Sequence, residues 1–262
     1  MTQVFLEKST VEQWDRDYYH PIALKYYDRA ISDMLRMMEV EPGATVLDAG
    51  CGPGVHSIRV AKAGYRVCAI DISKTMLEQA KCRVRVANVS DRVEFHQKDL
   101  TQLDFPDSSF CYAFSWGVII HIREAEKALD ELARIVEPGG KLALYLTNKT
   151  AADHKIESLM RFVQRKPLAD FHSFPFGDGI WYHMNNHKLW LWRFDAQAIV
   201  NYLAEKGLVL KHRRIGELSE IQRRLQGLPR HLLLRLNNLA YSLNIPPDIA
   251  TTSLFVFEKK RR

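Results

Sequence analysis

The sequence lacks any apolar run long enough to cross a lipid bilayer. A membrane-spanning helix needs about 18 or more consecutive apolar residues, and no stretch of this chain approaches that length. The first ten residues carry two charges and no apolar stretch of signal-peptide length. We therefore expect a cytoplasmic protein. Its 262 residues, of which 47% are hydrophobic, suffice for one large α/β domain with insertions.

Cysteine is scarce, and its spacing excludes the common zinc sites. No C-x-x-C pair occurs and no histidine lies at zinc-ligand spacing from any of the four cysteines, Cys51, Cys68, Cys82 and Cys111. Three of them lie on or beside predicted buried strands, where a thiol behaves as a small hydrophobic group. We therefore expect reduced, structural cysteines and no bound metal.

The net charge of +6 is unevenly distributed. Residues 259–262 alone supply +4, and residues 211–235 hold seven Lys or Arg against two Glu. The rest of the chain is therefore slightly acidic, which argues against a general nucleic-acid surface. The favoured interpretation of both basic stretches is a solvated helix face and a solubilising tail.

The chain is organised around residues 45–54, where a short apolar strand leads into three glycines in T-V-L-D-A-G-C-G-P-G. Glycines after a strand let main-chain N–H groups approach a ligand, usually a nucleotide at the carboxyl end of a parallel sheet. The dinucleotide fingerprint G-x-G-x-x-G is missing because position 55 is valine, and Pro53 removes a donor from the turn. The P-loop pattern is absent too. The loop therefore disfavours NAD and P-loop nucleotides.

Strand and helix patterns alternate through most of the chain, as a parallel sheet requires. Apolar runs predict strands at 45–49, 66–70, 93–97, 110–115, 141–147, 208–212 and 253–257. Helical periodicity predicts helices at 9–39, 54–63, 74–87, 124–135, 195–206 and 216–243. Pro21 predicts a kink or a break near His20. Residues 148–194 are aromatic and rich in histidine, which is typical of a lid or a binding insertion.

The motif D-A-G-C-G-P-G resembles motif I of the class I S-adenosylmethionine-dependent methyltransferases, of the small-molecule, type 11-like kind. The resemblance covers residues 40–147 well and 195–258 loosely. It implies a Rossmann-like, doubly wound α/β sheet of seven strands whose last strand is antiparallel. The expected regions are an N-terminal helical lid (1–41), a cofactor-binding core (42–147), an aromatic substrate-binding insertion (148–194), and a C-terminal completion of the sheet (195–262) with a helical insertion at about 216–243.

The resemblance implies S-adenosylmethionine as the cofactor. Asp71 ends the second strand, where a carboxylate can accept hydrogen bonds from both ribose hydroxyls; a helix-capping surface Asp is the alternative. Asp99 follows the third strand and resembles the residue that accepts from the adenine amino group, although Asp often simply ends a strand. The predicted cofactor contacts are Asp48, Gly50, Cys51, Gly52, Gly54, Asp71, Ile72, Met76, Asp99, Leu100, Ser115 and Trp116, with Tyr18 and Tyr26 closing over them from the N-terminal lid.

His121 is the candidate catalytic residue. It follows the fourth strand in S-W-G-V-I-I-H-I, a stretch that resembles the one lying beside the sulfonium and the acceptor in this family. A histidine suits a general base, which is needed only if the acceptor is protonated; a buried packing histidine is an equal alternative. The predicted substrate contacts are Trp116, His121, Trp181, Tyr182, His183 and His187, unless the aromatic residues only pack the insertion onto the core.

Several platforms of other methyltransferase subfamilies are absent. After the fourth strand the chain has no N-P-P-Y or D-P-P-Y, on which nucleic-acid enzymes hold an extruded base. A paired-glutamate loop, an Asp-Asn metal pair and a Pro-Cys motif are also missing. These absences favour methyl transfer to oxygen or nitrogen, and less readily to carbon, of a small, partly apolar molecule.

Two alternatives stay open. The first is a lipid or isoprenoid methyltransferase at a membrane surface, because the helix around Arg223 and Arg224 is basic and rich in leucine. A helix that covers the pocket or joins a homo-oligomer explains the same pattern and is preferred. The second alternative is a module that binds the cofactor without performing chemistry.

Overall fold

The computed structural model describes residues 20–163, 165, 171–184 and 187–261. Seven strands form its main sheet, in the spatial order β3 (Val93–Gln97), β2 (Arg66–Asp71), β1 (Thr45–Ala49), β4 (Phe110–Trp116), β5 (Val136–Thr147), β10 (Thr252–Lys259) and β9 (Leu208–Ile215). Neighbouring strands are parallel from β3 to β5, and β10 is antiparallel to both β5 and β9. The predicted doubly wound sheet with an antiparallel last strand is confirmed.

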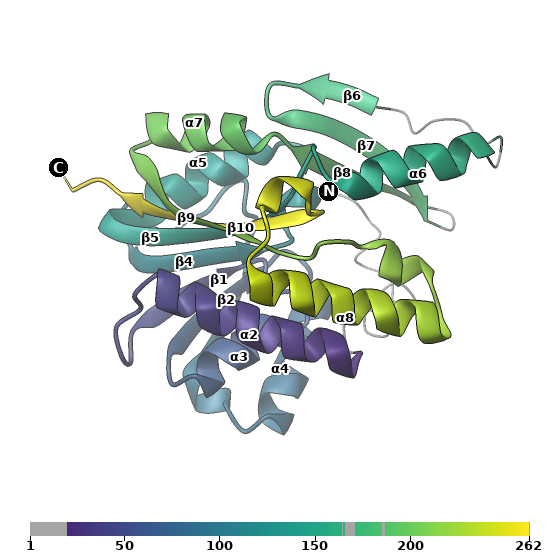
Figure 1. Ribbon diagram of the computed structural model, residues 1–262. Coiled ribbons are helices and arrows are strands. Elements are labelled where there is room, and N and C mark those ends of the chain that lie inside the picture. The colour runs from purple at the N-terminus through teal and green to yellow at the C-terminus, as the bar shows by residue number, and fades with distance from the viewer. Residues whose placement is uncertain (1–19, 164, 166–170, 185–186, 262) are drawn as a thin grey trace.

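Helices cover both faces of this sheet (Figure 1). One face carries α2 (Pro21–Met37), α3 (Val55–Lys62), α4 (Lys74–Val86) and α8 (Gly227–Leu243), and the other carries α5 (Ala125–Ile135) and α7 (Ala196–Glu205). Each face has its own buried apolar cluster, because the parallel strands are apolar on both sides. Because β1, β2, β4 and β5 are parallel, their carboxyl ends share one edge of the sheet, and the candidate site lies there.

Helix α2 begins at Pro21, so the predicted interruption near His20 is the start of the helix. The His20 side chain accepts the Ile22 N–H, and Pro21 occupies a first-turn position that needs no N–H donor. Tyr26, Ala30 and Met34 face inward and are almost fully buried. From residue 21 onward, the segment predicted to be a lid is thus part of the core.

The stretch 148–194, to which the sequence analysis assigned no regular elements, folds into a helix and a small antiparallel sheet. Helix α6 (Ala152–Val163) is followed by β6 (Phe171–Phe174), β7 (Gly177–Met184) and β8 (His187–Phe194), paired in that order. Trp192 ties β8 to the core, because its Nε1–H donates to the Ile122 carbonyl at 2.8 Å. The Trp190 ring lies directly over Gly179, where a Cβ atom would come within 1.9 Å of it.

The C-terminal helical insertion is shorter than the predicted 216–243. Residues 216–220 are not helical; a short 3₁₀ turn η4 (Ile221–Arg224) precedes α8. The Glu217 N–H donates to Thr252 Oγ1 at 2.7 Å, which holds this stretch against the start of β10. Within the described residues, no helix is both long and apolar enough to cross a membrane.

The Trp190–Gly179 contact gives a stability prediction. We expect Gly179→Ala to lower the free energy of unfolding by about 1–3 kcal/mol, because the added methyl displaces the Trp190 ring from a packed position. Urea unfolding followed by tryptophan fluorescence measures this change. Lys188→Ala, an exposed position on the neighbouring strand β8, is the control and should change little. Equal stability of the two variants would contradict the packing described here.

Candidate functional site

The glycine-rich loop connects β1 to α3 at the carboxyl edge of the sheet. The N–H groups of Gly50 and Cys51 both donate to the Ile70 carbonyl of β2 at 2.8 Å, which fixes the turn. Gly50, Gly52 and Gly54 all have positive φ, a conformation that favours glycine. A Cβ atom at Gly50 would lie 2.5 Å from the Val118 side chain, whereas one at Gly52 would meet nothing within 4 Å. The loop is therefore packed at Gly50 and open at Gly52.

Asp48 lies beneath this loop. Its carboxylate is 1% exposed and accepts a hydrogen bond from Ser57 Oγ at 2.6 Å, which joins the end of β1 to α3. Burial raises the pKa of Asp48 to about 7, against the opposing effect of the Ser57 bond. Asp48, a predicted cofactor contact, therefore lies under the loop and is hydrogen-bonded to Ser57. Cys51 is buried beside it, and burial raises the pKa of its thiol well above the usual range.

Asp71 stands against the open part of the loop. One carboxylate oxygen accepts the Gly52 N–H at 2.9 Å, and the other accepts the Ser73 N–H at 2.8 Å. Partial burial raises the pKa of Asp71, while these main-chain bonds oppose the shift. A carboxylate oxygen has two lone-pair sites, so both oxygens keep acceptor capacity for a ligand with paired hydroxyls.

Asp99 follows β3 on the same edge and is exposed. Its Oδ1 accepts from both the N–H and the hydroxyl of Thr101, each at 2.8 Å. Ile72 is half-buried next to Asp71, whereas the Met76 and Leu100 side chains are buried in the core. Of these predicted contacts, Asp99 and Ile72 are the ones with accessible side chains.

The end of β4 contributes one buried hydrogen bond and one stacked aromatic ring. Ser115 Oγ donates to the Ala49 carbonyl at 2.8 Å, so the hydroxyl joins β4 to β1. Trp116 stacks on Tyr145 of β5, with ring centroids 4.1 Å apart and an interplanar angle of 9°. Tyr26 reaches the same place from α2, its hydroxyl 3.0 Å from that of Tyr145. Tyr18 lies outside the described residues.

His56 is a candidate ligand contact that the sequence analysis missed. It lies in the first turn of α3, between Tyr27 at 5.4 Å and Trp116 at 4.9 Å, measured between ring centroids. Its Nδ1 is buried and has no hydrogen-bond partner among the described residues. Burial also holds the pKa of His56 well below its usual range. An unpaired buried nitrogen next to the glycine loop is a place for a ligand hydrogen bond.

His121 is held by the small sheet. Its Nδ1 lies 3.1 Å from the Trp190 carbonyl of β8. Because a carbonyl only accepts, Nδ1 carries the proton and Nε2 is the acceptor nitrogen. Burial, opposed by the Trp190 bond and assisted by the positive charge of Arg223, lowers the pKa of His121 to about 4. The imidazole is therefore neutral at pH 7.

The predicted substrate contacts in the insertion divide into two groups. Trp181 lies on β7, half-buried, with its ring centroid 5.1 Å from that of the buried Trp190. Tyr182, His183 and His187 lie on the paired strands β7 and β8, but their side chains lie outside the described part of the chain. The described aromatic residues mostly pack against one another and against the core.

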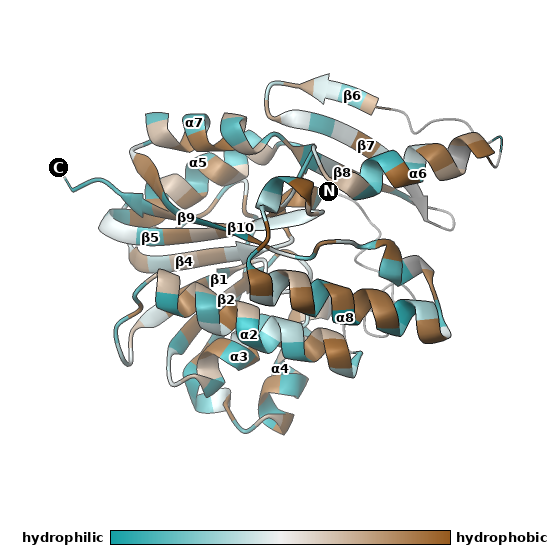
Figure 2. Ribbon diagram, viewed as in Figure 1, coloured by the Kyte–Doolittle hydropathy of each residue, from teal (hydrophilic) through white to brown (hydrophobic). Residues whose placement is uncertain are grey.

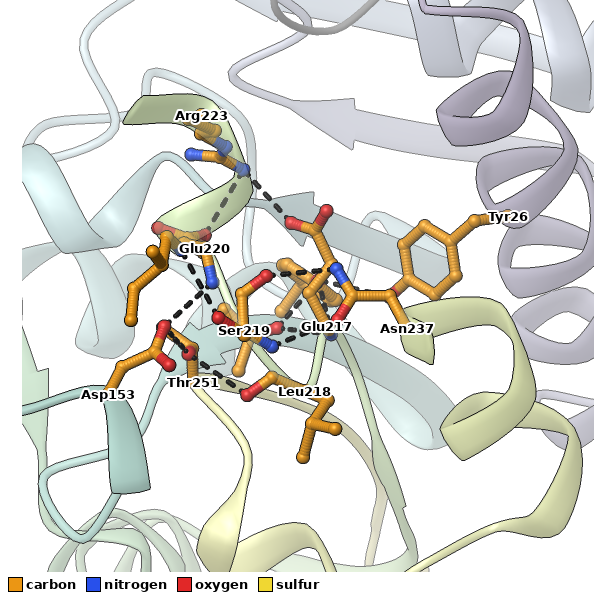
Figure 3. Close-up of polar contacts among 12 residues, drawn as sticks. Tyr26, Asp153, Glu217, Leu218, Ser219, Glu220, Arg223, Asn237 and Thr251 are labelled. Atoms are coloured by element: carbon orange, nitrogen blue, oxygen red, sulfur yellow. Dashed lines mark hydrogen bonds and ion pairs between the residues drawn. The ribbon is translucent and has the colours of Figure 1, made fainter. Parts of the chain in front are cut away.

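A polar cluster after β9 is a second feature that the sequence analysis missed (Figure 3). Glu217 is 2% exposed, and its Oε2 accepts from Arg223 Nη2 at 2.9 Å. Arg223 also pairs with Glu220 at 3.1 Å, and the Glu220 N–H donates to Asp153 at 2.7 Å. Burial raises the pKa of Glu217, and the Arg223 charge opposes this. No sequence signal marks the burial of this cluster, because it depends on distant partners, such as Asp153 for Glu220 and Tyr145 for Glu217.

This cluster belongs to the same edge as His121 and Trp116. The Glu217 N–H donates to Tyr145 OH at 3.2 Å, and Tyr145 stacks on Trp116. The positive charge of Arg223 also contributes to the lowered pKa of His121. Among the described residues, no group of His, Cys, Asp and Glu is arranged to hold a metal ion.

Comparison with known proteins identifies the central part of the chain. Residues 46–140 match a family model described as "Methyltransferase domain". This range contains the glycine loop, Asp71, Asp99, Trp116 and His121, so the sequence match and the clustered residues coincide.

Two curated relatives match the same region. One is 27-O-demethylrifamycin SV methyltransferase from Amycolatopsis mediterranei, 37% identical over 41% of this chain and 40% of that protein. Another is demethylmenaquinone methyltransferase from Clavibacter sepedonicus, 41% identical over 39% of this chain and 40% of that protein. The chain spans about two fifths of the length of the curated relatives it matches.

Among solved structures, the fold is similar to that of an S-adenosylmethionine-dependent methyltransferase from Methanosarcina mazei. The TM-score is 0.61 at 19% identity, covering 93% of this chain and 99% of that one. At this identity the likeness concerns the fold, which extends well beyond the region of sequence match.

The buried Asp48 carboxyl predicts a pH-dependent stability. Because the pKa of Asp48 is about 7 in the folded chain against the ordinary aspartate value of 3.8, the folded chain binds this proton more tightly. The contribution is complete below about pH 4 and is lost as the pH rises through 7. We expect the free energy of unfolding of Asp48→Asn to fall less than that of the unmodified chain between pH 4 and pH 8, by on the order of 2–4 kcal/mol.

Urea unfolding at several pH values measures this difference. Asp91→Asn removes a carboxylate that is 77% exposed and serves as the control, with a pH slope like that of the unmodified chain. An Asp48→Asn variant with that same slope would show that Asp48 does not titrate in this range.

Proposed function

We propose that this chain is a class I S-adenosylmethionine-dependent methyltransferase that transfers a methyl group to oxygen or nitrogen of a small, partly apolar molecule. When bound, the cofactor supplies a methyl group activated on a sulfonium sulfur. The chain's own residues have to bind the cofactor, align the acceptor and, where needed, remove a proton.

The residues at the glycine loop fit this cofactor. The observation that supports the proposal most is the Asp71 carboxylate, which lies against the open Gly52 turn and keeps acceptor capacity for a ribose diol. Asp99 lies on the same edge with an exposed carboxylate, suited to an adenine amino group. The unpaired His56 Nδ1 adds a polar atom beside the loop. The site thus provides acceptors where an adenosine offers donors.

The acceptor side is formed by His121, Trp116 and the Glu217–Arg223 pair. We propose that neutral His121, held by the Trp190 carbonyl, receives a proton or a hydrogen bond from the acceptor at Nε2. The aromatic residues around it favour a partly apolar molecule. The buried Glu217 carboxylate, whose Oε2 accepts from Arg223, suits a hydroxyl or amine on that molecule.

A lipid-like acceptor is the second candidate, because one of the relatives is named for methylation of demethylmenaquinone. A chain that binds the cofactor without transferring its methyl group is the third. Incubation with methyl-labelled cofactor and extracts, followed by mass spectrometry of small-molecule and lipid fractions, separates the three. Label in a small molecule is expected; label chiefly in RNA, DNA or protein would overturn the proposal, as would tight binding with no transfer.

Cofactor binding predicts a specific effect of Asp71. We expect Asp71→Ala to weaken binding of S-adenosylhomocysteine by about 1.5–3 kcal/mol, because hydrogen bonds to a charged group are lost. Isothermal titration calorimetry measures this affinity, and the unmodified chain should not bind NAD. Asp71→Asn keeps the shape of the side chain and should show a smaller loss. Asp91→Ala is the control on an exposed carboxylate. An affinity unchanged in Asp71→Ala would remove this residue from the ribose.

The role of His121 predicts a loss of rate with retained binding. With the labelled acceptor in hand, we expect His121→Ala to lower kcat by about 10²–10⁴-fold while the affinity for S-adenosylhomocysteine stays nearly the same. Since its pKa is about 4, His121 is unprotonated above pH 5, so its protonation should slow the unmodified enzyme only below that pH. A loss of only a few fold would mean that His121 shapes the pocket without accepting a proton.

A further inference from the structure

Helix α8 presents leucines to solvent. Along one stripe of the helix, the exposed side chains are Leu228, Leu232, Leu236, Leu239 and Leu243, and the first of these is 71% exposed. The side that faces the core buries Asn237 and Ala240 instead, together with Leu234 and Tyr241. A helix of a globular protein ordinarily turns its leucines toward the core. The exposed face of α8 is therefore more apolar than the solvent-facing side of a helix usually is.

Helix α6 shows the same inversion. Its two acidic residues are buried: Asp153 accepts from Thr251 Oγ1 at 2.8 Å, and Glu157 accepts from Arg193 at 3.0 Å. Its exposed side chains are Ile156, Leu159, Met160, Phe162 and Val163, with Phe162 at 78% exposure. The helix thus directs its acidic residues inward and its large apolar groups outward.

The two helices lie at the same end of the molecule (Figures 1 and 2). Asp153, at the start of α6, accepts the Glu220 N–H, and Glu220 directly precedes the 3₁₀ turn η4 that leads into α8. Both helices are therefore anchored on the polar cluster that also contains Glu217 and Arg223. This cluster adjoins the proposed acceptor site, so an apolar phase touching the helices would lie close to that site.

The charge on α6 and α8 distinguishes between two possible partners for their exposed apolar faces. Residues 227–243 contain no acidic residue, and the described exposed charges on the two helices are basic, among them Lys155 and Arg235. A second copy of the chain would pair this surface with itself, because a two-fold interface uses the same patch on both subunits. Basic residues would then face basic residues. An anionic bilayer offers both the apolar phase and the opposite charge.

We propose that the α6–α8 surface docks on an anionic lipid bilayer, with its leucines and Phe162 entering the headgroup–acyl boundary. This interaction is peripheral and goes beyond methyl transfer, since it does not depend on which atom receives the methyl group. It gives the site access to acceptors that partition into the membrane.

Flotation of the full chain with vesicles tests the proposal. We expect binding to vesicles of phosphatidylcholine with phosphatidylglycerol, weaker binding to phosphatidylcholine alone, and release as salt is raised. The double variant Leu232→Gln/Leu236→Gln and the single variant Phe162→Gln should each reduce binding to the anionic vesicles at least about 5-fold. Val86→Gln changes an apolar side chain that is 80% exposed on α4 and is the matched control. Circular dichroism verifies that each variant is folded.

Three results would overturn the proposal. The first is the absence of binding to anionic vesicles, and the second is binding that the α6 and α8 variants leave unchanged. The third is a concentration-dependent dimer, seen by light scattering, that the same leucine variants abolish, because this would assign the surface to a second copy. Binding of S-adenosylhomocysteine is measured separately, so failure of membrane docking stays distinguishable from failure of the proposed methyl transfer.

Discussion

The hydroxyl of Tyr145 is the point on which the arrangement of the site depends. It accepts from Thr252 Oγ1 at 2.7 Å and from the Glu217 N–H, and it lies 3.0 Å from the Tyr26 hydroxyl. One buried oxygen thus connects β5, the start of β10, the segment after β9, and α2. The same side chain stacks on Trp116 at the end of β4. A buried hydroxyl costs free energy unless it is paired, so these four segments have to be placed together.

The two sides of the site are built differently. The proposed cofactor side consists of a loop and strand ends that are close in sequence, held by main-chain bonds such as those from Gly50 and Cys51 to the Ile70 carbonyl. The proposed acceptor side draws on the insertion through Trp190 and on the C-terminal region through Glu217. The family match, which ends at residue 140, covers the first side and leaves much of the second outside.

The sheet and the loop could be predicted from the sequence because both depend on patterns among neighbouring residues. The strand that ends in D-A-G-C-G-P-G and the acidic residue ending the next strand follow from spacing alone. His56 and Glu217 were missed, since their significance comes from neighbours far along the chain, such as Trp116 and Tyr145. The strand β8 was missed because its aromatic residues belong to the stretch 148–194, which is typical of a lid or a binding insertion, whereas the structure buries Trp190 and Trp192 as packing. Local pattern specifies an element, but not which of its faces is covered.

The position of β10 in the sheet determines when the sheet can be completed during synthesis. This strand is synthesised after β9 yet lies between β9 and β5, and its Phe255 and Phe257 are almost fully buried. Until residues 252–259 leave the ribosome, β5 has an unpaired edge and β9 has no place in the sheet. Unpaired strand edges are templates for association with other chains. A chain that stops before residue 252 would therefore leave β5 with an unpaired edge and β9 without its partner strand.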